Sequence, residues 1–64
     1  MSVLHIDYKR ETLKLNPECF LSRRMNHIYC VNIPSFRKNI FGTCEYEAWK
    51  RAFEFLKRVY NGKH

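Results

Sequence analysis

Residues 43–62 read TCEYEAWKRAFEFLKRVYNG, and their pattern constrains the rest of the chain. On a helical wheel of 3.6 residues per turn, apolar side chains fall on one half and charged side chains on the other. The apolar half consists of Tyr46, Trp49, Ala52, Phe53, Leu56, Val59 and Tyr60. The pattern predicts one long amphipathic helix, with Thr43 as its N-cap and Gly62 at its C-terminal cap. So broad an apolar face must pack against residues 1–42.

The residues before this helix favour strands. Alternating apolar and polar side chains predict strands over residues 3–8 and 12–15, with a charged break between them. In the second of these strands, Leu13 and Leu15 point inward, which leaves Lys14 on the opposite face. Asn16-Pro17-Glu18 has the composition of a turn.

The most regular strand pattern covers residues 27–33, where Tyr29, Val31 and Ile33 share one face. Pro34 ends this strand, because a proline inside it would remove a donor from the ladder. Residues 35–39 then form a basic hairpin loop, and residues 40–42 form a last short strand. For residues 19–24, strand and helix both remain open.

These elements predict a single small α+β domain over residues 1–64. We expect an antiparallel sheet of three or four strands, packed on one long C-terminal amphipathic helix. One helix covers one face of such a sheet, so the other face remains open to solvent or to a partner.

The charge balance indicates a polyanionic partner. The chain of 64 residues has 12 Lys and Arg against 6 Asp and Glu, a formal net charge of +6.

The sequence has no signal-peptide pattern and no apolar run long enough to span a membrane, and its three cysteines are an odd set. We therefore expect a cytoplasmic protein without membrane contact, in a reducing compartment.

A group of basic residues and one phenylalanine forms the candidate nucleic-acid interface. Its members are Lys14, Arg23, Arg24, Phe36, Arg37 and Lys38. We expect Lys14 on the open sheet face and the two basic pairs in loops at its edges, where they would contact phosphates. Phe36 could stack on a base, or its ring could fold back onto the core. The charges could also serve only to keep an aromatic-rich protein soluble.

No catalytic residue, metal site or cofactor is predicted. His27 and Cys30, with Cys19 and Cys44, include the ligand types of a zinc site, but no pair of cysteines has knuckle spacing. The two glycines, Gly42 and Gly62, do not form a phosphate-binding loop. A chain this short also has little room for a catalytic cleft beside its core.

Residues 29–53 resemble the second half of an APETALA-type (ethylene-response-factor) DNA-binding domain. The resemblance rests on alternating large residues from Tyr29 to Ile33, a basic hairpin, and the run from Ile40 through Gly42-Thr43 to Ala52. It extends to the arm-binding domains of phage integrases, which are also small sheet-plus-helix modules. It implies that the exposed sheet face reads the major groove of DNA, with Arg37 and Lys38 beside the matched part.

We therefore predict a small non-enzymatic accessory protein, of the phage or bacterial kind, that binds nucleic acid and in particular duplex DNA. The alternative is an interaction protein that docks on a host or partner enzyme and inhibits or redirects it. A homodimer through Ala48 and Phe55, at the flank of the helix's apolar arc, is a further option.

Overall fold

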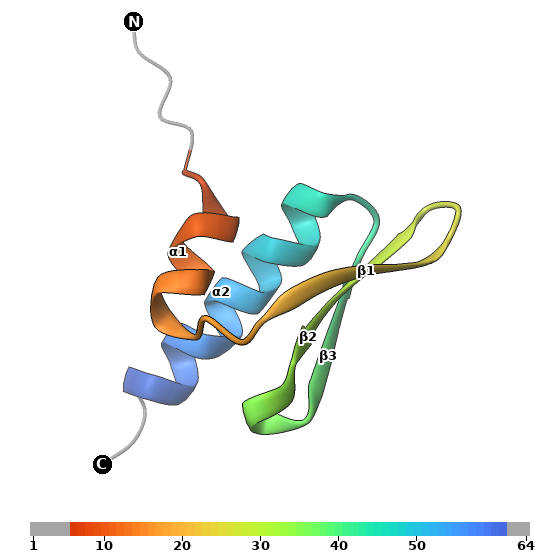
Figure 1. Ribbon diagram of the computed structural model, residues 1–64. Helices are drawn as coiled ribbons and strands as arrows, with labels where there is room; N and C mark the ends of the chain where they lie inside the picture. The colour runs from red at the N-terminus through yellow and green to blue at the C-terminus, as the bar shows by residue number, and fades with distance from the viewer. Residues whose placement is uncertain (1–5, 62–64) are drawn as a thin grey trace, which may run out of the picture.

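The computed structural model describes residues 6–61, which form two layers (Figure 1). The order of elements is α1 (Tyr8–Leu15), β1 (Phe20–Met25), β2 (Ile28–Ile33), the 3-10 turn η1 (Pro34–Phe36), β3 (Lys38–Gly42) and α2 (Glu45–Asn61). The three strands form one antiparallel sheet in the order β1-β2-β3. Both helices lie on the same side of this sheet, with α1 beside α2. The predicted α+β class is confirmed, and the structure shows three strands in the described residues.

The N-terminal part of the chain is a helix where strands were expected. Residues 8–15 form α1, and the Asp7 carboxylate caps it by accepting the Arg10 N–H at 3.2 Å. Thr12 is fully buried and donates its hydroxyl to the Trp49 carbonyl at 3.4 Å, whereas Leu15 is exposed. The predicted strand over residues 12–15 is therefore wrong. Of the predicted strand over residues 3–8, Val3 to His5 lie outside the described residues, and Tyr8 begins α1.

Residues 19–24, which the sequence left open, belong mainly to a strand. β1 pairs with β2 in a register that places Phe20 opposite Asn32 and Leu21 opposite Val31. The register shifts between Arg23 and Met25, which marks a bulge near the end of the hairpin. The predicted strand at residues 27–33 is confirmed as β2, and Pro34 follows it directly.

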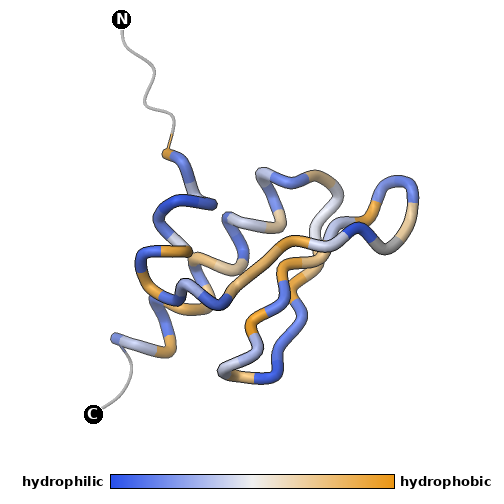
Figure 2. Tube along the Cα trace, in the orientation of Figure 1, coloured by the Kyte–Doolittle hydropathy of each residue, from blue (hydrophilic) through white to orange (hydrophobic). Residues whose placement is uncertain are grey.

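The C-terminal helix is confirmed, and it supplies half of the core. Ala48, Trp49, Ala52 and Leu56 are buried against Val31 and Ile33 of β2, and Cys19 joins the same cluster. Truncation of a large buried side chain such as Leu56 or Ile33 to alanine typically lowers the free energy of unfolding by about 2–5 kcal/mol. Figure 2 shows that hydrophobic positions recur along the strands and both helices, whereas the turn after η1 is hydrophilic.

The junction between β3 and α2 holds the two layers together at close range. A Cβ atom on Gly42 would lie 2.6 Å from the Ala48 backbone nitrogen and 2.8 Å from its Cα. Only glycine fits at this approach. Cys44, and not Thr43, occupies the cap position, because its Sγ accepts the Glu47 N–H at 3.4 Å. Thr43 instead donates both its N–H and its hydroxyl to the Glu47 carboxylate.

Candidate nucleic-acid interface

The sheet face that points away from the helices is apolar and aromatic. Side chains alternate between the two faces of a strand, so the observed register assigns each residue to a face. The outward side chains are Phe20, Ser22, Met25, Ile28, Cys30, Asn32, Asn39 and Phe41. We call these eight residues the open face. Its four large apolar side chains are exposed by 38–67%.

Two phenylalanines lie on opposite edge strands of the open face. Phe20 belongs to β1 and is 51% exposed, and Phe41 belongs to β3 and is 46% exposed. β2 separates them, so two strand spacings put them on the order of 10 Å apart across the sheet. In residues 6–61 neither ring packs on another aromatic ring, and each side chain is about half exposed, so part of each ring is available to a ligand.

Polar groups connect these two aromatic positions. Asn32 lies on the central strand, opposite Phe20 on one side and Asn39 on the other. Its amide donates to the Ser22 hydroxyl at 3.0 Å and accepts a weak bond from the Cys30 thiol at 3.9 Å. These bonds fix the orientation of the Asn32 side chain, while Asn39 is exposed and free to bind a ligand. The open face therefore combines aromatic rings with amide donors and acceptors.

None of the predicted basic residues whose side chains the structure describes lies on the open face. Lys14 is on α1, in the other layer, so its expected place on the sheet is wrong. Arg23 pairs with Tyr29 and points to the helix side, where its guanidinium lies 5.8 Å from the centre of the Tyr29 ring. Lys38 pairs with buried Ile33 and also begins on the helix side. Arg24 lies in β1, but its side chain is outside the described part of the structure.

Arg37 occupies a backbone conformation that side chains other than glycine rarely adopt. Its φ is 54° and its ψ is 42°, at the end of η1 and just before β3. Its N–H closes the turn by donating to the Pro34 carbonyl at 3.1 Å. A left-handed conformation costs about 1–2 kcal/mol for such a residue, and glycine would avoid the cost. The backbone of the exposed Arg37 is thus in an unfavourable conformation at one end of the sheet.

Phe36 folds back onto the core. Its ring packs edge-on against Phe55 at 5.7 Å and against Tyr60 at 5.9 Å. The structure therefore shows the second of the two alternatives for Phe36, and its ring is not free for stacking. The same packing occupies the ring of Phe55, and Ala48 is fully buried. Of the two residues suggested for a homodimer surface, Ala48 is therefore not exposed, and Phe55 is partly buried.

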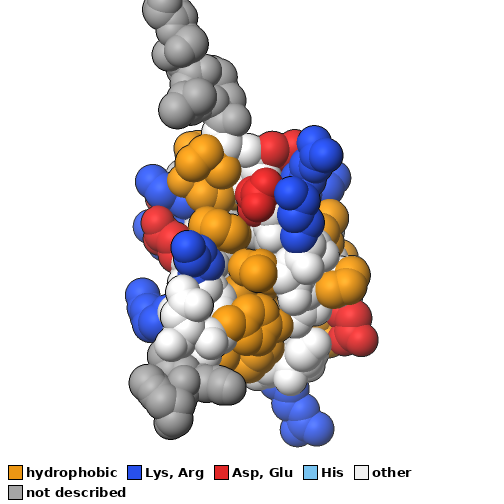
Figure 3. Space-filling model, turned by 90° about the vertical axis from the view of Figure 1, so that its left-hand side faces the viewer, with side chains coloured by type: hydrophobic (Ala, Val, Ile, Leu, Met, Phe, Trp, Pro, Cys, Tyr) orange, Lys and Arg blue, Asp and Glu red, His pale blue; other side chains and the backbone are white. Residues whose placement is uncertain are grey.

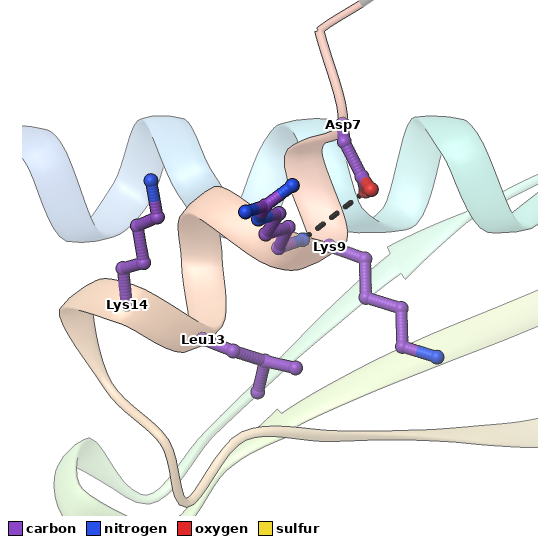
Figure 4. A pocket seen from close by; sticks show the side chains of 5 residues that line it. Asp7, Lys9, Leu13 and Lys14 are labelled. Atoms are coloured by element: carbon purple, nitrogen blue, oxygen red, sulfur yellow. Dashed lines mark hydrogen bonds between the residues drawn. The ribbon is translucent and has the colours of Figure 1, made fainter.

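A second cationic group lies on α1, around a shallow hollow of about 510 Å³ (Figure 4). Lys9, Arg10 and Lys14 line it together with Asp7 and Leu13. Figure 4 shows Lys9 and Leu13 pointing toward the strands, whereas Lys14 points the opposite way. Lys9 and Arg10 were not among the predicted site residues, because the sequence pattern placed them in a charged break between two strands. A reading of residues 8–15 as a helix would have grouped them.

Few of the cations are neutralised within the chain. The side chains that the structure describes form two ion pairs, Lys14 with Glu11 at 3.4 Å and Arg51 with Glu47 at 3.1 Å. Both pairs are on the surface, where ion pairs contribute little to stability. The excess of positive charge therefore remains available to an external anion.

The three cysteines lie in different environments. Cys19 is in the helix-side core, Cys30 is buried under the open face, and Cys44 is exposed before α2. Burial, with a smaller effect from the Glu18 carboxylate, raises the pKa of the Cys19 thiol. Among residues 6–61, no three His, Cys, Asp or Glu side chains come together as metal ligands.

None of the described helices is both long and apolar enough to cross a bilayer.

The resemblance of residues 29–53 to the ethylene-response-factor domain stays a prediction. Comparison with protein-family models, with curated proteins and with solved structures found no match to this chain.

Proposed function

We propose that this protein is a non-enzymatic nucleic-acid-binding protein that holds unpaired bases on the open face of its sheet. The observation that carries the proposal is the pair of exposed phenylalanine rings, Phe20 and Phe41, on one face. Exposed aromatic side chains on a sheet are a common platform for single-stranded nucleic acid, because every base offers a π-face. Each stacked base is worth about 1–3 kcal/mol.

The polar and charged groups around the rings fit the same ligand. The Asn39 amide can donate to and accept from the edge of a base that stacks beside it. At one end of the sheet, Arg37 is exposed and can contact a phosphate beside the stacked bases. The net charge of +6 adds a long-range attraction for any polyanion.

This arrangement changes the expected ligand from a duplex to unpaired nucleotides. A protein that rides the phosphates of a duplex needs cations on the contacting surface. No described cation begins on the open face, and its exposed area is contributed mainly by Phe20, Met25, Ile28 and Phe41. In a duplex the faces of the bases are stacked on one another, so they cannot reach these rings. DNA and RNA strands both satisfy the proposal.

The test is fluorescence anisotropy with labelled single strands of about 12 nucleotides and a duplex of about 16 base pairs. We expect the single strand to bind more tightly than the duplex. Phe20→Ala and Phe41→Ala should each weaken its binding by about 5- to 100-fold. Tyr46→Ala, which removes an exposed aromatic ring from the helix layer, is the matched control and should change the affinity less than twofold, a margin of about 0.4 kcal/mol.

Preference for the duplex, or single-strand binding that both phenylalanine variants retain, would contradict the proposal. Circular dichroism should accompany each variant, to show that it is folded. Affinity should also fall between about 50 and 200 mM salt, since phosphate contacts release counterions.

A second candidate function is docking on a partner protein through the same face. Met25, 67% exposed, and Ile28 favour it, because aliphatic side chains beside aromatic ones are typical of protein interfaces. A pull-down from lysate with and without nuclease separates the two candidates. A partner that remains after nuclease and is lost in Met25→Asp favours docking, whereas loss of all partners on nuclease treatment favours nucleic acid.

A further inference from the structure

The helix layer has an apolar surface of its own, along the line where α1 and α2 meet. On α2, Tyr46, Phe53 and Tyr60 are spaced by seven residues and therefore lie in one stripe. On α1, Tyr8 and Leu15 have the same spacing and face this stripe. We call these five residues the helix seam. Figure 3 shows apolar side chains running down this side of the molecule, with both basic and acidic side chains at their margins.

The helix seam borders the core that holds the two layers together, because Tyr8 packs against the core cluster and the Tyr60 ring meets that of Phe36. Tyr8 packs on the rings of Tyr46 and Phe53, each at 5.4 Å, and thus joins the two helices on their outer side. Yet Tyr46 is 55% exposed, and Tyr60 and Leu15 are also exposed. Large apolar side chains that gather on a surface in this way typically mark a site of interaction.

Two hollows lie along the helix seam. One, of about 300 Å³, is lined by Glu11, Lys14, Leu15, Phe53, Lys57 and Tyr60. The other, of about 350 Å³, is lined by residues that include Ile6, Tyr8 and Tyr46. Each is large enough for one or two apolar side chains, so the seam presents recesses to a partner.

The charge at the margins of the helix seam differs between its two hollows: the upper one is lined by Asp7 and Glu45 with Lys9, whereas lysines predominate at the lower one. The Lys57 ammonium lies 5.8 Å from the centre of the Phe53 ring, and Lys50 lies one helical turn from Tyr46 on the same flank. Lys14 lines the opposite side of the lower hollow and pairs with Glu11 at 3.4 Å. The lower part of the seam is therefore basic, and Glu11 is the one carboxylate among the residues that line its hollow.

We infer that the helix seam binds an acidic, amphipathic peptide segment of a partner protein. Its apolar side chains would enter the two hollows, and its Asp and Glu side chains would lie against Lys14, Lys50 and Lys57, away from the carboxylates of Asp7 and Glu45 at the upper hollow. This geometry is the helix-in-groove mode of recognition, with anchors spaced by three or four residues. The inference rests on the helix layer alone and is independent of the proposed function of the open face.

Charge and shape decide between this partner and the other occupants. A second copy of the chain would bring its own lysines against these lysines, at a net charge of +6 per chain. A bilayer surface fits protruding apolar side chains, whereas the seam is hollowed. A nucleobase would need a free ring face on Phe53, but Lys57 lies over that ring and Tyr8 packs on it.

The experiment is a selection from a display library of about 12-residue random peptides, carried out in parallel on the wild-type protein and on Lys57→Glu. Wild-type protein should select peptides with apolar residues at helical spacing and flanking Asp or Glu. Lys57→Glu should bind those peptides at least fivefold more weakly, which converts to about 1 kcal/mol, and should select fewer acidic ones. Lys38→Glu is the matched control, since it changes the same charge on β3 and should leave the selection unchanged.

Amide-shift mapping with a selected peptide identifies the surface. Shifts concentrated at residues 8–15 and 46–60, retained in Phe20→Ala, would support the inference. Shifts on the open face, peptides without an acidic preference, or equal binding by Lys57→Glu would overturn it. Stronger binding to anionic phospholipid vesicles that displaces the peptide would also overturn it, in favour of a membrane surface.

Discussion

The two exposed apolar surfaces of this molecule differ in the polar groups that surround them. On the open face, the phenylalanine rings neighbour amides and a hydroxyl, and the described cations begin elsewhere. Along the helix seam, the rings neighbour lysines, and one ring is covered by an ammonium group. Exposed apolar area alone does not indicate which class of ligand a surface binds, but the polar and charged groups around it do. Amides and exposed rings match bases, whereas an apolar hollow with a lysine margin, as at the lower end of the helix seam, matches acidic amphipathic side chains.

The largest effect should come from the junction that holds both surfaces in place. Gly42→Ala forces a Cβ into the Ala48 backbone, so we expect a loss of about 3 kcal/mol in the free energy of unfolding. Both ligands should be lost together when the protein unfolds. Urea titration followed by Trp49 fluorescence measures this, because Trp49 is the sole tryptophan and is buried. Asn39→Ala, an exposed position on the same strand, should stay within about 0.5 kcal/mol of the wild type.

Replacement of aromatic residues by leucine sharpens the comparison between the two surfaces. Phe20→Leu should weaken single-strand binding about five- to tenfold, because leucine keeps apolar area but cannot stack on a base. Tyr60→Leu should change peptide binding by less than about twofold, since the helix seam requires apolar volume and not a π-face. Anisotropy titrations give both numbers. Equal tolerance of leucine at both positions would mean that the open face also binds by burial, as a protein interface does.

Arg37 provides a smaller and more selective test. Arg37→Asn removes the charge but tolerates the left-handed backbone, so it should lower the salt slope of single-strand binding by about 0.7. It should also raise stability by up to about 1 kcal/mol, because a strained conformation is relieved. Arg58→Gln, with the same change in charge on the outer side of α2, should leave the slope unchanged. Equal slopes for the two variants would show that net charge alone matters.

The smallest effect that we expect is on the stability of the fold in acid, through Glu47 at the start of α2. Hydrogen bonds from the Thr43 hydroxyl and N–H, with the Arg51 guanidinium beside them, hold the pKa of Glu47 below its usual value. The folded state therefore favours the ionised form. Its contribution is present above the ordinary carboxyl pKa and is lost as pH falls through the lowered value.

Glu47→Gln should accordingly show a shallower loss of melting temperature between about pH 6 and pH 3 than the wild type. Glu54→Gln, at an exposed position on the same helix, should follow the wild-type curve. Identical acid sensitivity in all three proteins would contradict the role assigned to Glu47.

Sequence periodicity predicted the elements that are long or bounded by clear signals. α2 repeats its apolar pattern over several turns, and β2 alternates over a full strand before Pro34. The Gly42 junction was also placed correctly, since a glycine between a strand and a helix has a steric reason to be there. Local pattern was sufficient in these cases.

α1 could not be read in the same way, because it has only eight residues. Over so short a segment, Leu13 and Leu15 match a strand as well as a helix. The helix is stabilised by partners far along the chain: Tyr8 packs on Tyr46 and Phe53, and Thr12 donates to the Trp49 carbonyl. Isolated helices of this length are unstable, so tertiary contacts decided the outcome.

For a related reason, the candidate site could be predicted from the sequence only in part. Arg37 was correctly expected in the turn, since loop position follows from the sequence. The faces of β1 and β3 depend on register, and the sequence did not reveal that Phe20 and Phe41 share a side with Asn32. Lys14 was misplaced together with its element.

The three thiols differ in accessibility, so one cysteine can be labelled selectively. Cys44 lies at the start of α2 and is exposed, while Cys19 and Cys30 are enclosed and the first of them ionises reluctantly. A maleimide dye added at neutral pH should therefore attach at one position, without the removal of native cysteines. Such a conjugate would report on an oligonucleotide and a peptide in the same sample, and would show directly whether one molecule can hold both.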